Sequence, residues 1–408
     1  MSIIGIAAEY NPFHLGHEHH IAQTRALAGE DSTIVCAMSG DFVQRGEAAL
    51  YSKFARAEAA CRCGADLVLE LPLPWSLSSA EGFARGATAL LAAAGADTIS
   101  FGSEAGEIAP LEKLAELLIS PAAVDRTKEI LAKDANLSFA AARQRAVEET
   151  AGELAKLLET PNNILAVEYI KAIYTLNLNM KPMTLKREGS DHDAPGGGDI
   201  KSAAEIRRII ANGGDASVNL PQAAAAVFAQ ERRCGRELDY ERMELALLSR
   251  LRMLKEADFA AIPDAANGAG ARLFAAVRSE GSLNAVLAAA KTKRYALSRI
   301  RRMCMCAALG VTAELAAATP PYIRVLAANE RGRAQLRALA DTAPIPVVTK
   351  PASVKALSAE CRNVFVTGAY AHDLYTLAYR AEGERKAGED WRTGPQIVKY
   401  PQKDLKHF

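Results

Sequence analysis

Residues 8–17 read Ala-Glu-Tyr-Asn-Pro-Phe-His-Leu-Gly-His, and this stretch predicts how the N-terminal part of the chain folds. The apolar run Ile3–Ala8 before it is typical of a buried strand. Pro12 has no backbone N–H and biases Asn11 away from helical conformation, so the strand must end there. A helical pattern follows over His14–Ala28. The stretch therefore predicts a strand-to-helix turn.

Two imidazoles lie three positions apart at the start of this predicted helix. His14 and His17 share one helical face, beside the free N–H groups of the first turn and the positive end of the helix dipole. Gly16 between them lets a ligand approach the backbone. These features are typical of a site for phosphate oxygens. A metal site would need a third ligand brought close. We therefore favour phosphate binding and predict no metal ligands.

Several stretches carry a resemblance to known proteins. A strand, Asn-Pro and His-x-Gly-His resemble the signature of the nucleotidylyltransferase superfamily, which transfers adenylyl groups from ATP. Within it, the chain resembles the bacterial tRNA(Met) cytidine acetate ligase family. The matching stretches are residues 8–14, 38–47, 66–72, 101–104, 161–165 and 293–295. The resemblance runs from residue 1 to at least residue 328.

Length and composition set broad limits on the protein. With 408 residues, two or three domains are expected. The net charge of +1 gives no general attraction to nucleic acid, so any RNA contact must come from a local basic patch. The Cys-x-Cys pairs at 61–63 and 304–306 are one residue short of the usual zinc spacing, and we interpret them as core residues. We see no signal peptide and no membrane span, and expect a cytoplasmic protein.

Residues 1–104 alternate between strand and helix patterns. The expected strands are Ile3–Ala8, Ser32–Met38, Asp66–Leu71 and Thr98–Phe101, and the expected helices are His14–Ala28, Ser52–Cys63 and Ser79–Ala94. This alternation predicts an α/β fold with a doubly wound parallel sheet, which the resemblance identifies as a nucleotidylyltransferase (Rossmann-like) domain. Ligands of such sheets bind beyond the carboxyl ends of the strands.

A helical insertion is expected at about 107–176, inside the nucleotide domain. Its predicted helices are Leu111–Ile119, Ala122–Ala132, Phe139–Leu158 and Asn163–Tyr174. A strand at Met183–Lys186 and a helix at Ala203–Ala211 then complete a domain that spans 1–215.

Residues 216–408 are expected to form a mainly helical C-terminal domain, for which the resemblance implies tRNA binding. The chain reads as mainly helical from Leu220 to Ala340. Two later segments, Ile345–Thr349 and Val364–Val366, are strand candidates, and Asp373–Arg380 is expected to be a helix.

The resemblance implies an ATP site. The segment Ser202–Arg207 resembles the block that closes the phosphate site, although Ser-x-x-Glu is also a capping box, and both interpretations can hold. Arg207 can grip two phosphate oxygens at once. We expect the catalytic residues to be His14, His17 and Arg207. The expected ATP contacts are Ala7, Ala8, Glu9, Tyr10, Asn11, Pro12, Phe13, His14, Gly16, His17, His20, Gly102, Asn162, Asn163, Arg187, Glu188, Ser202 and Arg207.

Some of these residues have a plainer interpretation. Asn162 and Asn163 follow Pro161 at a helix start, where Asn most often only caps. Arg187 could be an exposed charge at a strand end, and Gly102 could be a turn. The glycine-rich loop 189–201 could close over a bound nucleotide.

Residues 291–302 carry six basic side chains and no acidic one. Such a run is often only a solvated helix face. The resemblance favours RNA, with phosphates for the cations and a base stacked on Tyr295. The expected RNA contacts are Lys291, Lys293, Arg294, Arg299, Arg301 and Arg302.

The resemblance implies a two-step reaction. Acetate attacks the α-phosphate of ATP, and the acetyl group then passes to N4 of the wobble cytidine of elongator tRNA(Met); we expect Mg²⁺ to assist. Two alternatives stay open from the residues alone. One is a small-molecule adenylyl- or cytidylyltransferase of coenzyme biosynthesis, and the other is a non-catalytic RNA-binding protein.

Overall fold

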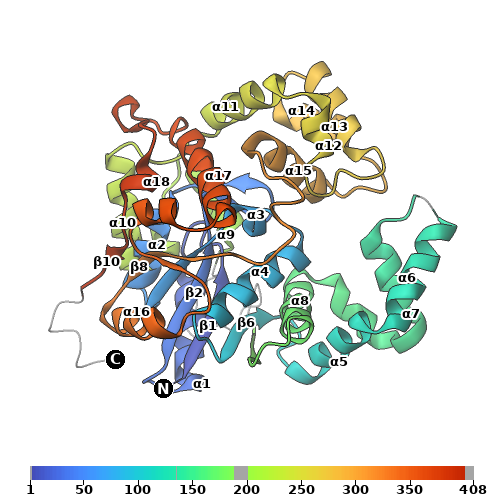
Figure 1. Cartoon of the computed structure of the whole chain (residues 1–408), viewed down its shortest axis with the longest axis horizontal. Coiled ribbons are helices and arrows are strands. Elements are labelled where there is room, and N and C mark those ends of the chain that lie inside the picture. Colours follow the sequence, from blue (N-terminus) through green and yellow to red (C-terminus); the bar gives the residue numbers. More distant parts are fainter. Residues whose placement is uncertain (1, 135, 188–200, 400–408) are drawn as a thin grey trace.

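The computed structural model describes residues 2–134, 136–187 and 201–399. Its centre is a mostly parallel sheet (Figure 1). In spatial order the strands are β10 (Gln396–Ile397), β8 (Ile323–Ala328), β5 (Leu67–Leu71), β2 (Thr33–Ser39), β1 (Ile3–Ala8), β6 (Thr98–Ser103) and β7 (Lys181–Lys186), with β9 (Val347–Val348) beside β8.

The strand order places a topological switch at β1. From β1 the chain moves outward to β2 and β5, and then returns to β6 and β7 on the other side of β1. All four of these pairings are parallel, whereas β8 runs antiparallel to β5. The carboxyl ends of β1 and β6 therefore meet where ligands of doubly wound sheets bind.

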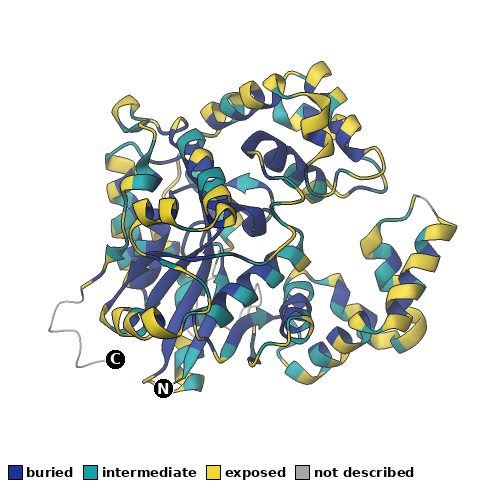
Figure 2. Cartoon of the chain, viewed as in Figure 1, coloured by how far each residue is buried: buried dark blue, intermediate teal, exposed yellow. Residues whose placement is uncertain are grey.

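Two hydrophobic cores cover the two faces of the sheet. Val35 and Ala37 of β2 face a core that includes α4 (Ala80–Ala93). Ile34 and Cys36 face the other core, which includes residues of α1 (Leu15–Ala28) and α2 (Lys53–Arg62). Figure 2 shows the strands buried between these layers. The predicted α/β fold with its doubly wound sheet is confirmed.

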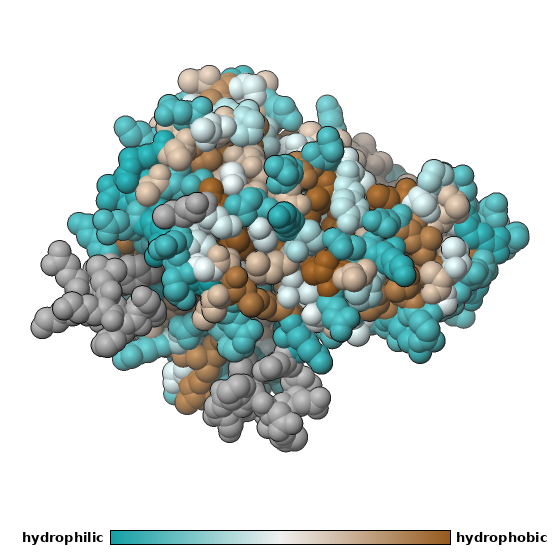
Figure 3. All heavy atoms as spheres, turned by 90° about the horizontal axis from the view of Figure 1, so that it is seen from below, coloured by the Kyte–Doolittle hydropathy of each residue, from teal (hydrophilic) through white to brown (hydrophobic). Residues whose placement is uncertain are grey.

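The insertion between β6 and β7 consists of helices. They are α5 (Ile108–Ile119), α6 (Pro121–Lys133), α7 (Phe139–Ala151), a 3₁₀ segment at Gly152–Glu159, and α8 (Pro161–Thr175). Helix α8 packs on α4, whereas α6 and α7 project from the body, and hydrophilic side chains gather at that end of Figure 3. The prediction of one helix over Phe139–Leu158 was wrong, because Gly152 has a φ of +47° that ends α7.

The C-terminal half begins with a second helical layer. Its helices are α11 (Tyr240–Met253), α12 (Glu256–Ala260), α13 (Ala269–Ser279), α14 (Leu283–Ala290) and α15 (Leu297–Leu309), whereas the preceding α10 (Gln222–Arg233) packs on α2. Helices α11 to α15 enclose a core of their own, which also receives Phe42 from the β3 (Phe42–Val43) and β4 (Glu47–Ala48) hairpin. This hairpin therefore joins the sheet layer to the helical layer.

The prediction of a mainly helical chain to Ala340 missed β8. This strand enters the main sheet beside β5, followed by α16 (Glu330–Thr342), a 3₁₀ segment at Pro351–Ala356, α17 (Ala359–Thr376), a 3₁₀ turn at Glu382–Glu384 and α18 (Glu389–Arg392). The strand candidate Val364–Val366 was wrong, since these residues lie inside α17. The helix expected at Asp373–Arg380 ends at Thr376. The sheet thus draws on both halves, and the division at residue 215 stays a prediction.

Within the described ranges, we find no helix that is both long and apolar enough to cross a membrane. The two Cys-x-Cys pairs lie in hydrophobic cores, as interpreted from the sequence.

Candidate functional site

His14 and His17 form a reciprocal cap at the start of α1. Nδ1 of His14 accepts the Gly16 N–H at 3.1 Å, and Nδ1 of His17 accepts the His14 N–H at 3.2 Å. The two ring centroids are 3.8 Å apart. The predicted pairing of these imidazoles on one face of a helix start is confirmed.

This cap fixes the chemistry of both rings. Each Nδ1 accepts a backbone N–H, so in a neutral ring the proton must reside on Nε2. Burial, with Arg187 nearby, lowers the pKa of His14 to about 4. Burial also holds the pKa of His17 well below its usual range. Both rings are therefore neutral near pH 7 and offer an Nε2–H donor, which suits phosphate oxygens.

Arg187 lies close to this histidine group. Its positive charge helps to lower the pKa values of His14, His17 and His20. For His20, burial is the main cause, and the pKa falls to about 4. His20 also contacts the Ser100 hydroxyl, 3.2 Å from Nε2. The structure thus brings residues from the ends of β1 and β7 together across the switch in strand order.

Gly102 makes room for the Arg187 side chain. A Cβ atom at residue 102 would lie 2.8 Å from Cγ of Arg187, closer than such atoms pack. We expect Gly102→Ala to displace the guanidinium and to raise the KM for ATP about tenfold, the lower limit for a lost hydrogen bond to a charged group. Steady-state kinetics check this, with Gly281→Ala as control, because a Cβ there meets open space. An unchanged KM would show that Arg187 does not contribute to ATP binding.

Arg207 reaches the same turn from α9 (Ala203–Ala211). Its Nη1 donates to the Asn11 carbonyl at 2.7 Å, and its Nη2 pairs with Glu47 at 3.2 Å. The other oxygen of Glu47 lies 2.6 Å from Nη1 of Arg301. One carboxylate of the β3–β4 hairpin therefore links the predicted phosphate-binding arginine to the basic segment.

The other predicted residues of the first turn differ in accessibility. Tyr10 and Phe13 are buried in the core, and the Tyr10 hydroxyl contacts Cys36 Sγ at 3.4 Å. The Asn11 side chain accepts the Leu50 N–H at 2.9 Å. These side chains hold the turn in place, so Tyr10 and Phe13 offer a nucleotide only their backbone, whereas Nδ2 of Asn11 is buried without a partner among the described residues. Pro12 and Ala8 are buried too, whereas partly exposed residues are Ala7, Glu9 and Gly16.

Asn162 and Asn163 have partners within the chain. Glu104 accepts Asn162 Nδ2 at 2.6 Å and the Asn163 N–H at 2.8 Å, and so caps α8 with a carboxylate. Asn163 Oδ1 accepts the Ala105 N–H at 3.0 Å. Both amides thus hold the end of β6 to α8, and their contact with ATP stays a prediction.

Ser202 and Glu205 form the predicted capping box. The Ser202 hydroxyl accepts the Glu205 N–H at 3.3 Å and donates to the Glu205 carboxylate at 2.7 Å. The Ser202 hydroxyl is thus engaged within α9. Glu188 and nearly all of the glycine-rich loop lie outside the described residues.

The basic segment is only partly exposed. Lys291 and Lys293 are exposed, whereas Arg294, Arg299, Arg301 and Arg302 are half-buried. Tyr295 is 5% exposed, and its hydroxyl donates to the Asn267 carbonyl at 3.1 Å. The guanidinium of Arg299 already covers the Tyr295 ring, with Cζ 4.7 Å from the ring centroid. The expectation that Tyr295 stacks on an RNA base is therefore wrong.

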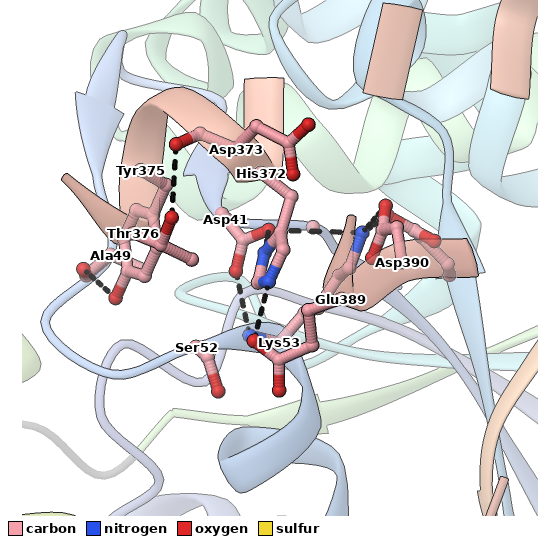
Figure 4. A network of polar contacts seen from close by, with 12 residues as sticks. Asp41, Ala49, Ser52, Lys53, His372, Asp373, Tyr375, Thr376, Glu389 and Asp390 are labelled. Atoms are coloured by element: carbon pink, nitrogen blue, oxygen red, sulfur yellow. Dashed lines mark hydrogen bonds and ion pairs between the residues drawn. The ribbon is translucent and has the colours of Figure 1, made fainter. Parts of the chain in front are cut away.

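A buried ion network, which no local sequence pattern predicts, supports the strand ends (Figure 4). We define it as Asp41, Lys53, Glu70, Arg324, His372, Glu389 and Asp390. Lys53 Nζ lies 2.8 Å from Glu70 and 2.7 Å from Asp390. Arg324 contacts the same two carboxylates at 2.8 and 3.0 Å. The network fastens β8, α17 and α18 to the loop that follows β2.

His372 is the part of this network that titrates. It lies 2.8 Å from Asp41 and 2.9 Å from Glu389. Burial alone would lower its pKa, but the Asp41 and Asp390 carboxylates together with these hydrogen bonds raise the pKa to about 10. The charged ring is thus favoured in the folded state.

Stability should depend on pH through His372. The stabilisation is complete below the ordinary pKa of 6.5 and is lost as pH rises toward 10. Between pH 7 and 9 we expect the free energy of unfolding to fall more in the wild type than in His372→Gln, by at most about 1.4 kcal/mol per pH unit. Urea unfolding at both pH values measures this. Equal losses in the two proteins would show that the ring is neutral when folded.

Comparisons with known proteins identify the family of the chain. The model of the HIGH nucleotidyl transferase family matches residues 1–390. A tRNA(Met) cytidine acetate ligase of Syntrophotalea carbinolica is 38% identical, covering 86% of this chain and 85% of its own. One of Acetivibrio thermocellus is 31% identical, covering 96% and 98%. The crystal structure of Thermotoga maritima TmcAL bound with alpha-thio ATP matches with a TM-score of 0.90 at 30% identity, covering 98% and 100%. The chain therefore belongs to the HIGH nucleotidyl transferase family and, within it, to the tRNA(Met) cytidine acetate ligases.

Proposed function

We propose that this protein is an ATP-dependent ligase that acetylates N4 of the wobble cytidine in elongator tRNA(Met). An acetate oxygen attacks the α-phosphorus of ATP, giving acetyl-adenylate and pyrophosphate. The cytidine N4 amine then attacks the acetyl carbon, loses a proton and expels AMP. The names of the relatives and the alpha-thio ATP in the matching structure support this reaction.

One observation carries the chemical part of the proposal. The Nδ1 atoms of His14 and His17 both accept backbone N–H groups, so each neutral ring carries its proton on Nε2 as a donor for phosphate oxygens. Arg187 lies near His14, and Arg207, which pairs with Glu47, donates to the Asn11 carbonyl of the turn. Preorganised donors of this kind stabilise the negative charge that develops as pyrophosphate leaves. We assign the catalytic role to His14, His17 and Arg207.

Mg²⁺ is a further part of the proposal. In the part of the chain that the structure describes, no group of three His, Cys, Asp or Glu side chains is placed to hold a metal ion. Mg²⁺ in such enzymes commonly binds substrate phosphates with few protein ligands. We therefore expect the phosphates of ATP to hold it, and we assign it no protein ligand.

Transfer of labelled acetate tests the proposal. The protein is incubated with ATP, radiolabelled acetate and elongator tRNA(Met), and the digested tRNA is analysed for N4-acetylcytidine. We expect the label at the wobble position. The control is a transcript with uridine at that position, which lacks the exocyclic amine. Equal labelling of both transcripts, or none of either, would contradict the proposal.

A further inference from the structure

The three arginines of α15 differ in their partners. Arg299 donates to the Asp264 carbonyl at 2.8 Å, and its Nε lies 3.8 Å from the Asp264 carboxylate. Arg301 is paired with Glu47 at 2.6 Å. Arg302 makes no hydrogen bond or ion pair with any described residue, and its Nε is buried without a partner. Among these three cations, Arg302 is the one without a direct ion pair to a described residue, although the Asp264 carboxylate stabilises its charge from a distance.

The Arg302 side chain lines a cavity of about 230 Å³ between the start of α4 and α15. Leu77, Met303 and Ala316 form apolar parts of the wall, and Ser79 and Asp264 are polar parts. The volume far exceeds the ~30 Å³ that one water occupies in the liquid. Burial lowers the pKa of Arg302, which means that its charge is poorly solvated here. An anion in the cavity would offset that cost.

We propose that this cavity binds one backbone phosphate of the RNA substrate, with Arg302 as its principal donor. The proposal rests on the proposed function, which supplies the RNA. A guanidinium binds phosphate oxygens through two parallel hydrogen bonds. The Ser79 hydroxyl accepts the Gly82 N–H at 3.3 Å, so its own proton is available to a second oxygen.

The charge of the wall favours a phosphodiester over a nucleotide. The Asp264 carboxylate lies near Arg299 and also stabilises the charge of Arg302, so these three side chains together carry a net charge of +1. A phosphodiester carries one negative charge and matches this net charge, whereas a triphosphate carries several and would exceed it. The apolar wall at Leu77 and Met303 suits the carbons of a ribose next to the phosphate.

The position of the cavity fits RNA that approaches the nucleotide site. The β3–β4 turn lies directly on α15, because a Cβ at Gly46 would be 2.8 Å from the backbone of Arg301 and Arg302. On the same turn of chain, Glu47 contacts Arg207. The β3–β4 hairpin would thus lie between a phosphate held by Arg302 and the predicted catalytic residue Arg207.

Salt-dependent tRNA binding tests the proposal. We expect Arg302→Gln to raise the Kd for elongator tRNA(Met) roughly tenfold and to lower the slope of log K against log salt by about 0.7–0.9, the value for one phosphate contact. The control is Arg272→Gln, which removes an exposed charge from α13 and should leave the slope nearly unchanged. Thermal unfolding verifies that each variant is folded. An unchanged slope in Arg302→Gln would overturn the proposal.

A second pair of variants tests the cavity itself. Ala316→Leu fills it from the wall and keeps all charges, whereas the neighbouring Ala317 is exposed and lies outside the lining. We expect Ala316→Leu to weaken tRNA binding several-fold and Ala317→Leu not to. Wild-type affinity in Ala316→Leu would place the contact of Arg302 outside the cavity.

The source of the phosphate is tested by the kinetics of ATP. An effect of Arg302→Gln confined to tRNA assigns the phosphate to RNA, and a raised KM for ATP would assign it to the nucleotide and overturn the proposal. The proposed function fails separately, if the wild-type protein shows no acetate-dependent exchange of pyrophosphate into ATP.

Discussion

Replacing His14 with Asn is expected to slow acetyl-adenylate formation by about 10²–10³-fold while the fold keeps its stability. The Asn Oδ1 can accept the Gly16 N–H as Nδ1 of His14 does, and Asn is a favoured N-cap residue. It lacks the Nε2–H donor that we assign to the phosphates. The variant therefore separates the structural role of His14 from its catalytic role.

His14→Ala and His17→Ala complete this experiment. Both should lose activity to a similar degree, and His14→Ala should also lose about 1 kcal/mol of unfolding free energy because the cap is gone. Acetate-dependent exchange of pyrophosphate and urea unfolding measure the two effects. A wild-type exchange rate in His14→Asn would show that the imidazoles serve only as a cap.

Replacing Lys53 with Met is expected to cost about 3–5 kcal/mol of unfolding free energy. Lys53 is 1% exposed and lies against two buried carboxylates, Glu70 and Asp390, which would then share only Arg324. Arg62→Ala on the same helix is the control, since its pair with Glu58 is exposed and should contribute less than about 1 kcal/mol. Urea unfolding compares the two variants. A loss in Lys53→Met as small as that of the control would mean that the network is not needed for the fold.

Some elements could be predicted from the sequence because local patterns determine them. The run Ile3–Ala8 is apolar throughout, as buried parallel strands are, and β1 has those bounds. Helix α9 likewise follows its capping box at Ser202. The pair His14 and His17 could be found for the same reason, since residues three apart meet in any helix.

Features that depend on distant partners could not be predicted. The segment Ile323–Ala328 is apolar enough for a helix or a strand, and only pairing with β5, more than 250 residues earlier, makes it β8. Val364–Val366 favours a strand by its β-branched residues, but it packs within α17, which Ser358 caps. The contact of Lys53 with Asp390 spans 337 positions, and no local pattern marks it.

The central claim is most directly tested by acetate-dependent exchange of labelled pyrophosphate into ATP by the wild-type protein. Because acetyl-adenylate forms before the RNA reacts, we predict exchange that requires acetate and occurs without tRNA. The His14→Asn variant should reduce it by about 10²–10³-fold. Exchange at the same rate without acetate, or exchange that requires another small acid instead, would contradict the assignment of this site to acetate activation.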